Sequence, residues 1–198
     1  RERGIKRLYF LSRDSYILQR IAEQLPHKDI ELRYLFVSRK SLLLPYLHNA
    51  TAEKFLAIQD KRTIRGKTVK ELATSLGTST EELKEKFGIE FNFDKIATKE
   101  QEQTFLSSIF GVGSSYLLAL NEHAKEKRTL LNIYFKQENL FARSTTAMVD
   151  VGWLGTTRLM INSILKEEGC PETTFFYYGV RSDVMHSKYG KYHTYYSP

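Results

Sequence analysis

Three short and mainly apolar runs, each ending at polar residues or at a glycine turn, restrict the fold of this chain more than any other feature. They cover residues 8–11, 32–37 and 147–151. Short runs that do not alternate with polar residues are typical of strands covered on both faces, as in a parallel sheet. The end of each run, where the polar residues begin, is therefore the expected edge of a buried sheet.

Helical spacing of apolar residues connects these runs. We expect a helix over residues 16–25, between the first two runs, and another over 158–166, after the third. A last apolar and aromatic run, 174–180, adds a strand. Strand, helix and strand in this order form a parallel unit with a right-handed crossover. The prediction is an α/β fold, with a Rossmann-like parallel sheet flanked by helices.

The middle of the chain has a different pattern. Apolar residues there recur at helical spacing, and glycines mark the turns. We predict a central helical insertion or cap over 41–141, with an α/β core formed by 1–40 and 142–198. The chain begins with Arg1 and ends with Pro198, so we expect it to be a fragment of a longer chain. The tyrosine-rich tail is assigned to no element.

Composition narrows the partners. The formal net charge of +7 favours anionic ligands such as phosphates, nucleotides, nucleic acid or a membrane surface, although ordinary soluble domains also carry such an excess. The single cysteine, Cys170, excludes an internal disulfide and leaves too few thiols for a zinc site, which favours a cytoplasmic protein. No apolar run reaches the roughly 18 residues that a membrane-spanning helix needs, so we expect no membrane span.

Polar residues from three segments are expected to meet at one edge, because ligands of open parallel sheets bind beyond the carboxyl ends of the strands. Asp14 and Asp150 are the candidate catalytic residues. The candidate ligand-binding residues are Ser12, Arg13, Ser38, Arg39, Gly152, Trp153, Gly155, Thr156 and Thr157.

The third segment is the most informative. Gly152 and Gly155 permit a tight turn, and Thr156 or Thr157 can cap the following helix. The N-terminus of such a helix is a natural phosphate site. Asp150 could bind Mg²⁺, hold a ribose hydroxyl or act as a base. The alternative is an ordinary capped turn with a structural aspartate.

The remaining side chains have two interpretations each. Arg13 and Arg39 can bind phosphate or carboxylate in a bidentate manner. Alternatively, Arg13 pairs with Asp14, and Arg39 is a solvated charge. Trp153 could stack on a base or sugar ring, or fill a hydrophobic gap. The five histidines lack ligand spacing, so no metal-ligating residue is assigned.

A helix-turn-helix pattern competes with this interpretation. Residues 66–88 have the spacing of a DNA-reading helix pair, with Gly77 at the turn. The second helix would carry Glu81, Glu82 and Glu85 against two lysines, and this acidity opposes binding to phosphate. We therefore expect a plain helical pair, with nucleic acid an unlikely partner.

The motifs RERGIKRLYFLSRDSYIL, YLFVSRKSLLLP and MVDVGWLGTT together resemble a known family. It is the C-terminal region of bacterial predicted haloacid-dehalogenase-superfamily hydrolases associated with surface-polysaccharide biosynthesis and glycosyltransferases. The nucleophilic aspartate of that family belongs to an upstream region that nothing here matches, so the resemblance assigns phosphatase activity to no residue. The residues that match are Arg13, Asp14, Ser38, Arg39, Asp150, Gly152, Trp153 and Gly155.

The order of elements is also similar to type I phosphoribosyltransferases, although Val149 and Val151 flank Asp150 where adjacent acidic residues are usual. Together the patterns predict a domain that binds a phosphorylated small molecule or nucleotide sugar, with transfer or hydrolysis as the reaction if it is an enzyme. Other domains of the same chain are expected partners. The alternative is a protein-interaction domain that docks a glycosyltransferase or the upstream hydrolase, and DNA binding through 66–88 is third.

Overall fold

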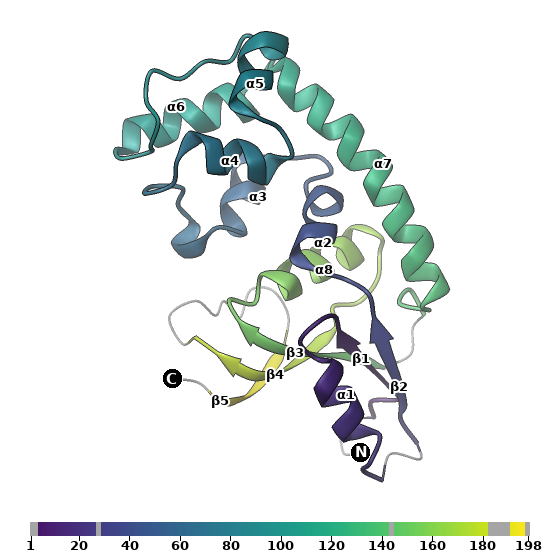
Figure 1. Ribbon diagram of the computed structural model, residues 1–198. Coiled ribbons are helices and arrows are strands. Elements are labelled where there is room, and N and C mark those ends of the chain that lie inside the picture. The colour runs from purple at the N-terminus through teal and green to yellow at the C-terminus, as the bar shows by residue number, and fades with distance from the viewer. Residues whose placement is uncertain (1–3, 27–28, 143–144, 182–190, 197–198) are drawn as a thin grey trace. The chain divides into compact units, whose positions relative to one another are not determined.

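The chain folds into two compact units. The computed structural model describes residues 4–26, 29–142, 145–181 and 191–196 (Figure 1). The first unit comprises Arg1–Tyr46 and Thr129–Pro198, and is called the sheet unit here; the second, Leu47–Arg128, is called the helical unit. Helix α7 (Ser115–Gln137) runs from the helical unit into the sheet unit.

The sheet unit contains a five-stranded parallel sheet, which confirms the predicted α/β fold. The strand order is β2-β1-β3-β4-β5. Four strands coincide with predicted runs, whereas the last comes from the tyrosine-rich tail that the sequence pattern left unassigned. The strands are β1 (Arg7–Leu11), β2 (Glu31–Leu35), β3 (Thr146–Trp153), β4 (Thr174–Val180) and β5 (Tyr192–Tyr196).

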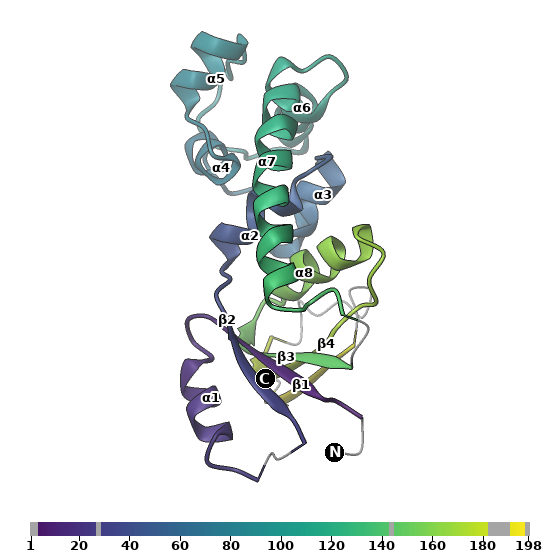
Figure 2. The same ribbon diagram turned by 90° about the vertical axis from the view of Figure 1, so that its right-hand side faces the viewer.

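Helices cover both faces of the sheet. Helix α1 (Tyr16–Ala22) lies on one face, and α2 (Arg39–Tyr46) and α8 (Thr156–Glu167) lie on the other, where they pack against each other (Figure 2). The step from β1 to β2 and the step from β3 to β4 run in opposite directions along the sheet. With right-handed crossovers, the helices that make these two connections must lie on opposite faces. The strand order therefore reverses between β1 and β3.

The α8 face of the sheet forms the core of this unit. Tyr9, Leu11, Met148 and Phe175 lie on it and are fully or almost fully buried. The hydroxyl of Tyr9 donates a hydrogen bond to the carbonyl of Glu138, just beyond α7. The end of α7 thus belongs to the packing of the sheet.

Helix α1 differs from the expectation of a buried apolar stripe. Its apolar residues have helical spacing, yet no residue of α1 is buried, and Ile17 is 64% exposed. The helix ends at Ala22, three residues before the predicted end at Leu25. The side chain of Phe10 on the sheet is covered, but the outer surface of α1 stays apolar.

Strand β3 runs two residues further than predicted. The predicted turn began at Gly152, but Gly152 and Trp153 still pair with Gly179 and Val180 of β4. This extension depends on glycine, because Gly152 has φ +119° and a Cβ there would collide with the carbonyl oxygen of Gly179.

The helical unit is built from short capped helices. Thr68 and Thr98 form reciprocal capping boxes with Glu71 and Gln101, and Gly77 ends α4 in a left-handed conformation. The elements are α3 (Ala52–Ala57), η1 (Asp60–Arg62), α4 (Val69–Leu76), α5 (Thr80–Phe87), α6 (Lys99–Phe110) and the first part of α7.

The two units meet in the sequence at 46–47 and 128–129, not at the predicted 40–41 and 141–142, because α2 and the end of α7 pack with the sheet.

Within the described residues, no single helix is long and apolar enough to cross a membrane. The bent pair α6 and α7, with 63° between the helices, meets the length and composition criteria only when taken together.

We expect Gly152→Ala to destabilise the protein by about 3 kcal/mol or more, because it adds a steric collision to an unfavourable φ. Gly169→Ala is the matched control: Gly169 has φ +73° but open space around it, so only strain of about 1–2 kcal/mol applies. Urea unfolding measures both. Equal losses would show that the approach to Gly179 is not the constraint.

Candidate functional site at the β1–β3 edge

The two candidate carboxylates come from distant segments and lie at the same edge of the sheet. Asp14 follows β1, and Asp150 lies in β3, which pairs with β1 in parallel with Phe10 opposite Val149. The charge of Asp14 makes a small contribution to the raised pKa of Asp150. They sit where the strand order reverses, the usual ligand position in open α/β sheets.

Burial dominates the electrostatics of Asp150. Loss of solvation raises the pKa of this carboxyl from 3.8 to about 6, and the charge of Asp14 adds to the rise. The backbone amides of Val151 and Gly152 donate to the carboxylate and act in the opposite direction. Near neutral pH, Asp150 is therefore a partly buried carboxylate whose ionisation lowers stability.

The sheet unit also contains buried polar groups that the sequence pattern did not single out. Tyr177 pairs with Asp150 in the sheet, and burial raises the pKa of its hydroxyl. Within the described part of the chain, the hydroxyls of Tyr177 and Ser15 are buried without a hydrogen-bond partner. Arg158 is almost fully buried, with its guanidinium 4.7 Å from the centre of the Tyr192 ring.

The sequence held weak signals for these residues. Period-two alternation along β4 places Tyr177 on the same face as Phe175, which is buried. Arg158 is the one charged residue among the first ten of α8. Nothing in the local pattern marks Ser15, whose burial follows from the turn after β1.

Arg13 lies at the predicted edge but makes only a local contact. Its side chain is 96% exposed, and its Nε is 3.9 Å from Oδ1 of Asp14. Pairs this exposed contribute little to stability. Of the two interpretations of Arg13, the local pairing with Asp14 is the one that the structure displays.

The serines of the first two segments have structural hydrogen bonds. The Ser12 hydroxyl donates to the carbonyl of Val37 at 2.7 Å, tying the ends of β1 and β2 together. Ser38 and Ser41 exchange hydrogen bonds at the start of α2. Arg39 is the exposed first residue of that helix.

The glycine turn joins β3 to α8 in left-handed backbone conformations. Gly152, Trp153 and Gly155 all have positive φ. Gly155 is the N-cap of α8 and has no side chain to cap the first amides. Thr156 and Thr157 are the first two helical residues, so they do not act as the predicted N-cap. The start of α8 next to Asp150 is thus suited to an anion.

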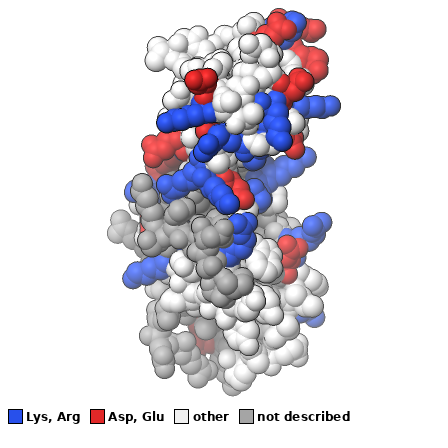
Figure 3. Space-filling view, turned by 90° about the vertical axis from the view of Figure 1, so that its left-hand side faces the viewer, with Lys and Arg blue, Asp and Glu red and all other residues white. Residues whose placement is uncertain are grey.

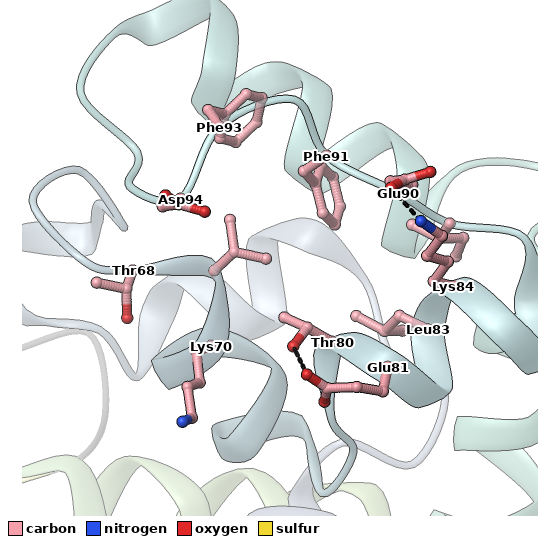
Figure 4. A pocket seen from close by; sticks show the side chains of 12 residues that line it. Thr68, Lys70, Thr80, Glu81, Leu83, Lys84, Glu90, Phe91, Phe93 and Asp94 are labelled. Carbon is pink, nitrogen blue, oxygen red and sulfur yellow. Dashed lines mark hydrogen bonds and ion pairs between the residues drawn. The ribbon is translucent and has the colours of Figure 1, made fainter.

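A cavity of about 490 Å³ lies in the helical unit, between α4, α5 and the segment 89–94 (Figure 4). Phe91 and Phe93 line it from that segment, and the ring of Phe91 points toward the two helices (Figure 4). Lys84 and Glu90 at its rim form an ion pair of 2.5 Å. The rim charges are thereby partly neutralised, and the lining offers apolar surface rather than an anion site.

The positive charge of the chain is uneven. The sheet unit carries 17 Lys and Arg against 11 Asp and Glu, whereas the helical unit carries 13 against 12. Within the helical unit, residues 61–70 contain five cations and no acid, and Figure 3 shows Lys and Arg side chains gathered on one face of it. The net excess therefore belongs to the unit with the candidate site.

The predicted helical pair exists, with α4 and α5 joined by residues 77–79. Both lysines of α5 are engaged, Lys84 with Glu90 and Lys86 with Glu82. This leaves α5 without the basic outward surface that a DNA-reading helix needs.

We expect Asp150→Asn to stabilise the protein above pH 6 by up to about 3 kcal/mol. The asparagine keeps an oxygen that can accept hydrogen bonds from the backbone amides, and it removes the charge. The raised pKa means that native stability from this group is complete below about pH 4 and lost as pH rises through about 6. The gain should therefore vanish near pH 4. Thermal unfolding of both proteins between pH 4 and pH 8 measures this gain, with a chelator present so that no metal ion affects the comparison.

The matched control is Asp94→Asn, an exposed aspartate of the helical unit, which should give no such gain. An Asp150→Asn protein less stable than the native protein at pH 7.5 would contradict the inference that the charge of Asp150 lowers stability.

The candidate site rests on geometry and on the sequence pattern. Comparison with known proteins found no matching family model and no similar curated protein. The resemblance to hydrolase-associated domains and to type I phosphoribosyltransferases therefore stays a prediction. What the chain can be assigned to is a fold: an α/β protein with a parallel sheet whose strand order reverses between β1 and β3.

Proposed function

We propose that the sheet unit binds a phosphorylated ligand, a nucleotide or sugar phosphate, at the carboxyl edge between β1 and β3. The observation that supports the proposal is the reversal of strand order at this edge, where Asp14 follows β1, Asp150 lies in β3 and α8 begins after β3. Hydrolysis or transfer at a sugar phosphate, and a link to surface-polysaccharide biosynthesis, follow only from the resemblance.

The phosphate would lie at the N-terminus of α8. The amides of the first turn have no capping side chain from Gly155, and the helix dipole favours negative charge at this end. The excess of positive charge in the sheet unit favours the approach of an anion.

Two carboxylates at the same edge would repel a phosphate, so we propose that a cation accompanies the ligand. A divalent cation such as Mg²⁺ between Asp14 and Asp150 would remove the repulsion. The described residues contain no group of three or more acidic, histidine or cysteine ligands. Mg²⁺, however, commonly binds through one or two carboxylates together with ligand phosphates. In this proposal the two aspartates hold the cation, and the phosphate of the ligand supplies further oxygen atoms to its coordination shell.

We expect binding of phosphorylated ligands to depend on Mg²⁺. With a saturating nucleotide or sugar phosphate, the native protein should gain about 5 °C or more in melting temperature with Mg²⁺ and little with chelator. An Asp14→Asn, Asp150→Asn protein should lose the difference between the two conditions. A panel of nucleotides, nucleotide sugars and sugar phosphates in a thermal-shift assay measures this.

Glu168→Gln, at the far end of α8, is the matched control and should keep the Mg²⁺ dependence. Failure of every phosphorylated compound to stabilise the native protein would overturn the proposal. Equal stabilisation in Mg²⁺ and in chelator would overturn the role of the two aspartates.

A further inference from the structure

The cavity of the helical unit has apolar side chains in its lining that other contacts hold in place. Val69 of α4 and Leu83 of α5 are almost fully buried. The ring of Phe91 stacks on the buried Phe105, with 5.1 Å between the ring centres, and its other neighbour, Phe93, lies at 5.5 Å. The apolar lining is therefore preformed. The volume of about 490 Å³ falls within the range of about 300–1,000 Å³ that is usual for ligand sites.

The segment that carries the two phenylalanines has unused backbone groups. Among the described residues, the backbone amides of 90–94 and the carbonyls of 90–93 have no hydrogen-bond partner. The segment is attached at its end, where the carbonyl of Asp94 accepts a hydrogen bond of 2.8 Å from the amide of Val69. Backbone groups stay unpaired only where water or a partner can reach them. This wall of the cavity therefore offers donors and acceptors to the backbone of an extended peptide.

The charge around the cavity is divided between two segments. Residues 61–70 carry five cations and no acid, and the last three of them line the cavity. Lys70 makes no ion pair with a described residue, although its charge reaches Glu81. Residues 80–95, on the other side, carry five acids and three cations, two of which are already in ion pairs. A peptide with acidic residues on one side of its apolar residues complements this division.

We propose that the cavity receives apolar side chains of an extended peptide from a partner protein, and that acidic residues of this peptide lie along 61–70. The inference goes beyond the proposed function, because it concerns the helical unit and uses no residue of the sheet unit. The unpaired backbone groups favour a peptide over a small apolar molecule, which would leave them to water. The acids of 80–95 oppose a long polyanion such as nucleic acid.

Random dodecapeptides displayed on phage and selected on the native protein test the proposal. Enriched peptides should contain apolar residues, at least one of them aromatic, next to a run of aspartate and glutamate. A synthetic copy of an enriched peptide, labelled with fluorescein, gives the affinity by fluorescence polarisation. Replacement of its apolar residues by serine, or of its acids by lysine, should weaken binding about tenfold or more in each case. A selection without enrichment would overturn the proposal.

Variants of the protein locate the peptide. Phe93→Ala removes one wall of the cavity and should weaken binding about tenfold. Lys70→Glu should weaken it about threefold or more, with a larger effect at low salt than at high salt. Leu118→Ala and Lys99→Glu are the matched controls, because both residues are exposed, belong to the helical unit and lie outside the lining. Both controls should keep the native affinity within about twofold.

Each outcome decides for or against the peptide site. Phe93 is half-buried, so the melting temperature of Phe93→Ala is measured as well; Lys70 is exposed, so Lys70→Glu decides the matter if Phe93→Ala does not fold. If the serine-substituted peptide binds as tightly as the parent, or if the variants behave like their controls, the proposal is wrong. Binding of duplex DNA or RNA that displaces the peptide and is unaffected by Phe93→Ala would assign the surface to polyanions and would also overturn it.

Discussion

The parallel pairing of β1 with β3 is the contact on which the rest of the sheet unit depends. It places Thr146 opposite Arg7 and so pairs two segments that the helical unit separates in the sequence. Without it, β1 and β2 would form an isolated two-stranded sheet, and β3, β4 and β5 would form a separate three-stranded sheet. The pairing also fixes where the strand order reverses, so the same contact that completes the core sets Asp14 and Asp150 at one edge of the sheet.

Polar groups under the start of α8 make this part of the core unusual. Tyr177 and Arg158 are buried, and Asp150 is partly buried. Polar groups in such surroundings lower stability unless they are hydrogen-bonded, and folds retain them mainly where they serve a purpose. A site for a charged ligand is a physical reason to keep a carboxylate at a position where an apolar residue would pack better.

The sequence predicted the sheet because its strands are continuous apolar runs, a pattern that only strands covered on both faces need. It also predicted the common edge of Asp14 and Asp150, since the carboxyl ends of parallel strands coincide. These inferences depend on periodicity and chain direction, which are local properties of the sequence.

Features that depend on tertiary contacts escaped prediction. β5 has no apolar run of its own, because its Tyr-His-Thr-Tyr-Tyr residues become a strand only by pairing with β4. The spacing of Ile17 and Ile21 predicted a buried helix face, but helical spacing does not reveal whether another element covers that face.

The hydrogen bonds from Val151 and Gly152 to Asp150 have a consequence for observing this site. Both amide protons point at a carboxylate whose charge changes within the accessible pH range, so their NMR frequencies follow that charge directly. A cation or phosphate arriving at the edge would move the same two resonances. The backbone of the turn thus contains its own spectroscopic reporter, without any added label.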